Sequence, residues 1–147
     1  MLTQIKSLLA GTAPKAGLDL RTAVAALLVE TAWSAEGFDA GERERIERLL
    51  EARFGISADA ARELLEDGDR VGRENVHVLR FTKRILDEMT HEERVEIIEM
   101  LWEVAYADGT LEADEERLVV KIAGLLFVSA GERNAARRRA MAKVGSI

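Results

Sequence analysis

The stretch Val95-Glu-Ile-Ile-Glu-Met-Leu-Trp-Glu-Val-Ala-Tyr106 decides the fold class, because apolar residues lie on almost every side of the helix it would form. The stretch Ala23-Val-Ala-Ala-Leu-Leu-Val29 has the same character. A helix that is apolar all round belongs in the middle of a bundle. The two stretches therefore predict a pair of central helices with other helices packed around them.

The rest of the sequence also predicts helices. There is one proline in 147 residues, and no stretch alternates apolar and polar residues as a half-buried strand would. Thr90-His-Glu-Glu93 and Ser129-Ala-Gly-Glu132 are capping boxes. We expect an all-α, single-domain bundle of about seven to eight helices, at 2–10, 19–35, 40–54, 58–71, 75–88, 91–107, 113–127 and 130–143.

Composition excludes several classes of protein. The net charge is −6 with 33% charged residues, and an acidic chain lacks the basic surface of a general nucleic-acid binder. Without cysteine there is no disulfide, thiolate zinc site, iron–sulfur cluster or thiol nucleophile. No apolar run reaches the roughly 18 residues of a membrane span, and the first residues do not resemble a secretory signal. We expect a cytoplasmic protein that does not bind nucleic acid.

We expect two parts along the chain: residues 1–17, an amphipathic helix and a linker, and residues 18–147, the helical domain. The first helix carries Leu2, Ile5, Leu8 and Leu9 on one face. Packing on the domain or on a neighbour would bury that face. The alternative is membrane contact through residues 2–10, although Lys6 is the one charge there to attract lipid.

The two central helices begin similar units about 73 residues apart, half the chain. Glu30-Thr-Ala-Trp-Ser-Ala-Glu-Gly-Phe-Asp-Ala-Gly-Glu42 parallels Glu103-Val-Ala-Tyr-Ala-Asp-Gly-Thr-Leu-Glu-Ala-Asp-Glu115. Each unit has an apolar helix, an aromatic residue, an acidic turn with glycine, and a second helix. The spacing predicts a pseudo-twofold repeat of helical hairpins within one domain.

At Leu101-Trp-Glu-Val-Ala-Tyr-Ala-Asp-Gly-Thr-Leu-Glu-Ala-Asp-Glu-Glu116 the sequence resembles the tellurite-resistance TerB family, and more closely its small stand-alone branch. Arg80-Phe-Thr and His91-Glu-Glu-Arg-Val fit the same branch, and the resemblance covers roughly residues 20–143. It implies an all-α bundle, a role in tellurite and other chemical stress in bacteria, and clustered acids that bind a divalent cation. A related domain occurs in a DnaJ-like membrane co-chaperone. The resemblance implies no catalytic activity.

The acidic turns are the candidate metal site. Between residues 87 and 116 there are twelve acids and one arginine, and a hard cation such as Ca²⁺ or Mg²⁺ relieves crowded carboxylates. The candidate ligands, in order of preference, are Asp108, Glu112, Glu115, Glu36 and Asp39. In the first unit Glu36 replaces the aspartate of the pattern, so we favour the second. The alternative is plain helix punctuation, because Asp-Gly forms turns and acids favour helix starts.

Two Glu-x-x-His motifs, Glu74 to His77 and Glu88 to His91, have the spacing of di-iron bundles. Thr90 predicts a helix boundary between Glu88 and His91, so we interpret both histidines as surface residues. The leading hypothesis is a non-enzymatic stress-response module that binds a protein partner and, weakly, a divalent cation. The alternatives are a metal-dependent enzyme built in the bundle and a membrane-surface adaptor.

Three further features concern packing and charge. Trp33, Trp102 and Tyr106 occur at helical positions that predict core side chains, and Gly124 predicts a close helix crossing. The arginines of 137–139 make the last helix basic. We expect them to complement the helix dipole and pair with the chain's own acids. The alternative for this helix is contact with nucleic acid or acidic lipid.

Overall fold

The computed structural model describes residues 19–33, 39–74, 78–107 and 111–145. These residues form seven helices and no strand, so the all-α prediction is confirmed. The helices are α2 (Leu20–Ala32), α3 (Ala40–Phe54), α4 (Ala58–Glu74), α5 (Val78–Glu88), α6 (His91–Ala105), α7 (Ala113–Leu125) and α8 (Ala130–Gly145). Each end lies within three residues of its prediction. The helix expected at 2–10 lies outside the described residues.

Side-chain hydrogen bonds at the helix starts explain why the sequence predicts these boundaries. The Asp39 carboxylate accepts a hydrogen bond from the Glu42 backbone N–H, and Glu42 accepts one from Asp39 in return. Thr90 with Glu93 makes the same reciprocal pair at the start of α6. Helix α3 ends at Phe54 and is capped by Gly55, whose left-handed φ of 60° suits glycine.

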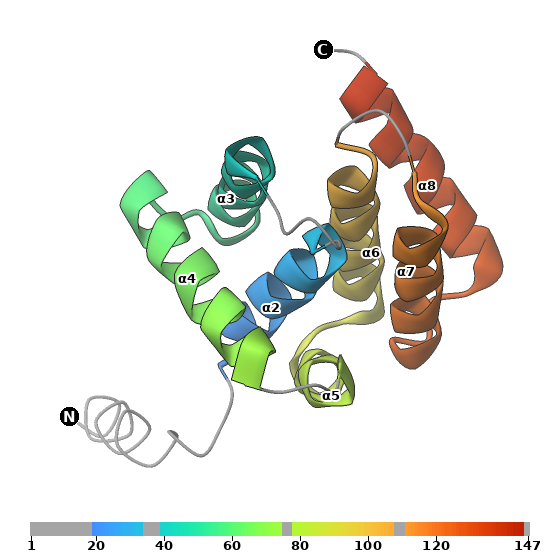
Figure 1. Ribbon diagram of the computed structural model, residues 1–147. Helices are drawn as coiled ribbons and strands as arrows, with labels where there is room; N and C mark the ends of the chain where they lie inside the picture. The colour runs from blue at the N-terminus through green and yellow to red at the C-terminus, as the bar shows by residue number, and fades with distance from the viewer. Residues whose placement is uncertain (1–18, 34–38, 75–77, 108–110, 146–147) are drawn as a thin grey trace.

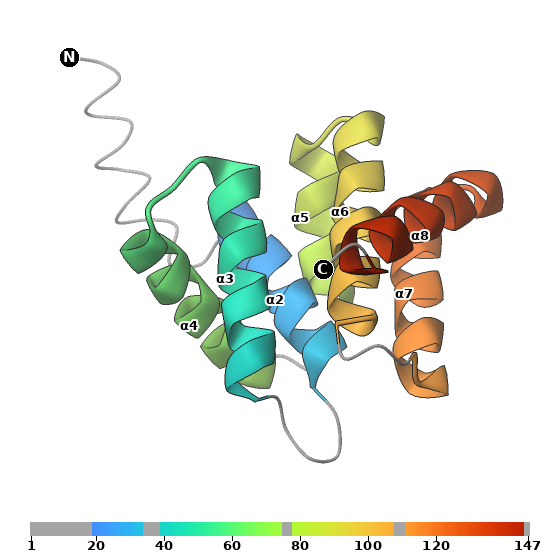
Figure 2. The ribbon, with the colours of Figure 1, turned by 90° about the horizontal axis from the view of Figure 1, so that it is seen from above.

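Helices α2 and α6 lie at the centre of the bundle, as the apolar stretches predict. Figure 1 shows α3 and α4 on one side of α2, and α6, α7 and α8 on the other. The view from above in Figure 2 shows the same order. Helix α2 packs on α4, α6 packs on α8, and the two central helices contact each other. The internal symmetry of the two halves stays a prediction.

The close helix crossing occurs at Gly68 on α4. A β-carbon at Gly68 would lie 2.7 Å from Ala25 Cβ and 2.8 Å from the Ala26 backbone nitrogen. The crossing predicted at Gly124 is wrong, since Gly124 is exposed and a β-carbon there would meet no atom within 4 Å. Both glycines lie within helices, and a sequence does not say which one faces a neighbouring backbone.

The core prediction holds for one of the three aromatic side chains. Trp102 is fully buried, and Tyr106 is half-buried beside it. Trp33 is 37% exposed, so its assignment to the core is wrong. The reason is that α2 ends at Ala32, which puts Trp33 beyond the buried helix. There its Nε1 donates to Asp69, and the Arg73 guanidinium lies 4.7 Å from the ring centroid.

None of the described helices combines the length and the apolar character that crossing a bilayer requires.

Candidate functional site

The five predicted metal ligands are only partly placed by the structure. Asp39 is the N-terminal cap of α3, and its carboxylate is engaged by Glu42. Glu112 occupies the cap position of α7 without a side-chain cap bond, and Glu115 follows in the first turn. Asp108 and Glu36 lie outside the described residues. Within the described part of the chain, no three acidic or histidine side chains form a metal-binding group.

One contact between the two predicted units is visible. A shallow depression is lined by Ala107, two residues after the end of α6, and by residues of the first half of α3 and its cap, namely Asp39, Gly41, Glu42, Glu44, Arg45 and Arg48. The start of α3 therefore lies beside the point where the second acidic turn begins. Glu112 and Glu115 do not line this depression.

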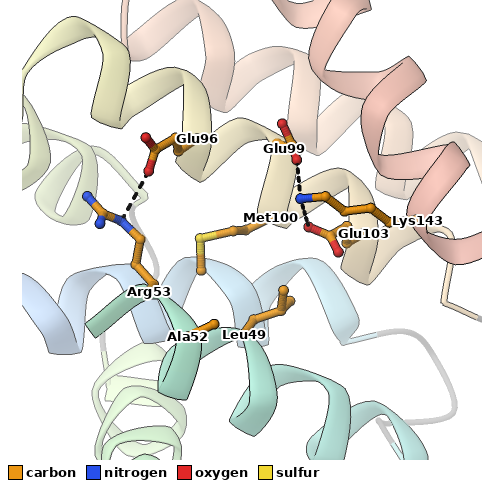
Figure 3. Close-up of a pocket in the computed structure, with 8 residues that line it drawn as sticks. All are labelled: Leu49, Ala52, Arg53, Glu96, Glu99, Met100, Glu103 and Lys143. Carbon is orange, nitrogen blue, oxygen red and sulfur yellow. Dashed lines mark hydrogen bonds and ion pairs between the residues drawn. The ribbon is translucent and has the colours of Figure 1, made fainter. Parts of the chain in front are cut away.

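A different group of acids lines a groove between α3, α6 and α8. Figure 3 shows this groove, which has a volume of about 280 Å³. Helix α3 contributes aliphatic side chains and an arginine, α6 contributes three glutamates and a methionine, and α8 contributes a lysine. The lining residues are Leu49, Ala52, Arg53, Glu96, Glu99, Met100, Glu103 and Lys143.

Helical spacing places the three glutamates together. Glu96, Glu99 and Glu103 are three and four residues apart, which puts them on one face of α6. The other faces of α6 are buried in the core, including Ile97, Ile98 and Leu101. The acidic face is therefore directed between α3 and α8, where Glu99 and Glu103 are buried and depend on their partners, while Glu96 is exposed.

Glu99 is well satisfied. It is 9% exposed, and both carboxylate oxygens accept hydrogen bonds from α8. Arg139 Nε lies 2.6 Å from Oε1, and Lys143 Nζ lies 2.5 Å from Oε2. Burial by itself raises the pKa of Glu99, but the hydrogen bonds from Lys143 and Arg139 outweigh it and hold the pKa below its ordinary value. Glu99 therefore holds the C-terminal half of α8 against α6 through these two side chains.

Glu103 is more deeply buried and less satisfied. It is 7% exposed, and its Oε2 forms an ion pair with Lys143 Nζ at a distance of 3.8 Å. Among the described residues none donates a hydrogen bond to Glu103. Burial raises the pKa of Glu103 above its ordinary value, and the charge of Glu99 adds to this; the charges of Lys143 and Arg45 only partly oppose it. The Glu103 carboxylate faces the groove with acceptor capacity to spare (Figure 3).

Glu96 lies at the opposite end of the groove from Lys143 (Figure 3). Its Oε2 is 3.7 Å from Arg53 Nε, while Arg53 Nη2 makes the shorter contact of 3.0 Å to Glu93. Leu49 and Met100 lie between the two charged ends. The groove thus has carboxylates at both ends and an apolar middle, which suits an elongated cation.

The sequence contained a signal for this site that our prediction did not use. Glu99 and Glu103 are among the twelve acids of residues 87–116, but the acidic-turn pattern points to other residues as ligands. The useful signal is that Glu96, Glu99 and Glu103 form one acidic face on a helix whose other faces are apolar. Such a face on a central helix points either to a buried ion pair or to a binding groove.

The family model of the tellurite resistance protein TerB matches residues 21–138. The chain belongs to the TerB family. No significant match was found among curated proteins or among solved structures. The matched residues include the three groove glutamates of this TerB-family chain and end just before Arg139 and Lys143, the two cations that bind Glu99.

The described histidine is placed away from the groove. His91 is the first residue of α6, whereas Glu88 is the last residue of α5, so the two do not share a helix. His91 Nε2 lies 2.7 Å from Glu132 Oε2 at the start of α8. His77, in the other Glu-x-x-His motif, lies outside the described residues.

Proposed function

We propose that this TerB-family chain is a non-enzymatic, tellurite-resistance-type module that binds a protein partner in the groove between α3, α6 and α8. One observation carries the proposal: Glu103 is a carboxylate with 7% exposure that faces an open groove and accepts no hydrogen bond from a described residue. A buried charge without full partners is costly. A ligand that brings a donor would remove that cost, which makes the groove a place for binding.

The size and lining of the groove favour a side chain of a protein over a small metabolite. Its volume of about 280 Å³ lies just below the roughly 300–1,000 Å³ found for small-molecule pockets. The groove is also open along α3, where Ala52 is exposed, so a segment of another chain can approach along that helix.

A photo-crosslinking residue placed at Ala52 tests the proposal in bacterial cells exposed to tellurite. The same residue placed at Leu79, which is 59% exposed on α5, is the control for an exposed position outside the groove. We expect a protein cross-linked from position 52 and not from position 79, and we expect Glu103→Gln to abolish it. Cross-linked products that are the same from both positions, or that survive Glu103→Gln, would contradict the proposal.

We also propose that a divalent cation, Ca²⁺ or Mg²⁺, binds weakly at the acidic turns, with Asp108 and Glu112 as first ligands and Glu115, Glu36 and Asp39 after them. The proximity of Ala107 to the start of α3 supports an approach of the two turns. Calcium titration by calorimetry, with Asp108→Asn and Glu112→Gln as variants, tests this second proposal. Binding that neither variant weakens would overturn the assignment.

A further inference from the structure

We infer that the group entering the groove is a basic side chain of the protein partner, whose cation pairs with Glu103 in competition with Lys143. The inference rests on the proposed function, and it names the chemistry of the partner. It follows from the acceptors that remain open, the shape of the lining and the occupant already present.

The acceptors that remain open are on Glu103 and Glu96, not on Glu99. Both oxygens of Glu99 already accept from α8. The Glu103 ion pair measures 3.8 Å, beyond hydrogen-bond distance, and the Glu96 ion pair measures 3.7 Å. The Glu96 side chain is 58% exposed and reaches water, so Glu103 is the acceptor that gains most from an entering cation. A positively charged donor would give Glu103 a charge-assisted hydrogen bond, which is the stronger kind.

The lining between these acceptors suits the aliphatic part of a basic side chain. Leu49, Ala52 and Met100 form the apolar middle of the groove. Lysine and arginine bury their methylene groups along apolar surface while the charged end reaches a polar partner. A carboxylate ligand would meet three glutamates against two cations, Arg53 and Lys143, and both cations already pair with glutamates. An uncharged apolar ligand would leave Glu103 without a donor.

Lys143 shows how such an ammonium is held. It extends from α8 and places its Nζ between Glu99 and Glu103, as Figure 3 shows. Its distances of 2.5 Å and 3.8 Å show that one ammonium does not satisfy both carboxylates at once. Lys143 is 58% exposed, so its side chain can withdraw toward solvent when a second cation enters.

The experiment uses side-chain analogues on the full chain, followed by amide NMR shifts. Butylammonium represents lysine, butylguanidinium represents arginine, and butanol is the uncharged control. Glu103→Gln removes the proposed acceptor, Lys143→Met removes the competitor, and Glu63→Gln on α4 is a matched substitution of an exposed glutamate outside the groove. The spectrum of each variant also reports whether it is folded.

We expect either cation, but not butanol, to shift the amides of Ala52, Met100 and Glu103. Glu103→Gln should weaken this binding about tenfold, the loss of one hydrogen bond to a charged group. Lys143→Met should strengthen it, and Glu63→Gln should leave it unchanged. Equal binding to the wild type and the folded Glu103→Gln variant, shifts outside the groove, or equal binding of butanol would overturn the inference.

The two experiments together distinguish a failure of this inference from a failure of the proposed function. A crosslink from position 52 that depends on Glu103, but joins a partner segment without lysine or arginine, would overturn this inference and leave the proposed function standing. Binding of the cations without any cross-linked protein would overturn both, because no protein partner would then lie in the groove.

Discussion

Glu99 and Glu103 lie one turn apart on α6, yet the pKa of Glu99 is lowered and that of Glu103 is raised. Burial acts on both carboxyls in the same direction, so their partners make the difference. Glu99 accepts two hydrogen bonds from Arg139 and Lys143, whereas Glu103 has the 3.8 Å ion pair with Lys143. The same helix face therefore carries one carboxylate that stabilises the fold and one held at a cost.

Neutralising each carboxyl should consequently have unequal effects on stability. Glu99→Gln should lower the free energy of unfolding by about 1–2 kcal/mol at neutral pH, because two charge-assisted hydrogen bonds weaken; this figure is reduced for the half-exposed Arg139 and Lys143. Glu103→Gln should change it by less than about 0.5 kcal/mol or stabilise the fold, since the amide avoids the cost of a buried charge. Urea unfolding monitored by circular dichroism measures both. A Glu103→Gln variant as destabilised as Glu99→Gln would show that the two carboxyls are equivalent.

The dependence of stability on pH should also separate the two groups. The lowered pKa of Glu99 means that its contribution is present above the ordinary value of 4.5 and is lost as the pH falls from there through its folded-state pKa. The raised pKa of Glu103 means that the folded state binds a proton more tightly than the unfolded chain. Stability is therefore gained as the pH falls from the folded-state pKa of Glu103 to 4.5.

Unfolding of the two variants across acid pH measures these contributions. Relative to the wild type, Glu103→Gln should lose the gain that appears just above pH 4.5, and Glu99→Gln should lose less stability below it. Parallel curves for the wild type and both variants would mean that neither carboxyl titrates differently in the folded state.

Two glycines one turn apart on α4 offer a matched test of packing. A β-carbon at Gly68 would overlap the backbone of α2, whereas one at Gly72 would meet nothing within 4 Å. Gly68→Ala should destabilise the protein by about 1–3 kcal/mol, as overpacking does. Gly72→Ala should stabilise it by about 0.5–1 kcal/mol through helix propensity. Melting temperatures would move in opposite directions by about 2–4 °C per kcal/mol, and two shifts of the same sign would place the crossing elsewhere.

The helices could be predicted because their signals are local. Side-chain periodicity and capping pairs such as Thr90 with Glu93 depend on residues three or four apart. The groove could not be derived this way, since it requires α3, α6 and α8 to meet. The repeat shows what local sequence patterns do not predict. Glu30 and Glu103 begin similar units, but Glu30 is exposed, whereas Glu103 is buried beside α8. The proposed ligand Asp108 stays a prediction, and the structure adds a groove that the turn pattern did not indicate.

Phe127 provides the last prediction, because its backbone conformation is unfavourable for a residue other than glycine and its apolar ring is exposed to solvent. It lies between α7 and α8 with a left-handed φ of 57°, and its side chain is 71% exposed. The Val128 N–H donates to the Ala123 carbonyl across this residue, which is the turn that glycine usually makes at a helix end. Phe127→Gly should therefore raise the free energy of unfolding by about 1 kcal/mol through relief of the left-handed strain. Phe127→Ala keeps the β-carbon and removes the ring, so it should leave stability within about 0.5 kcal/mol of the wild type. Chemical unfolding of the two variants tests this reasoning, and a Phe127→Gly variant less stable than Phe127→Ala would show that backbone strain at this turn is not what limits stability.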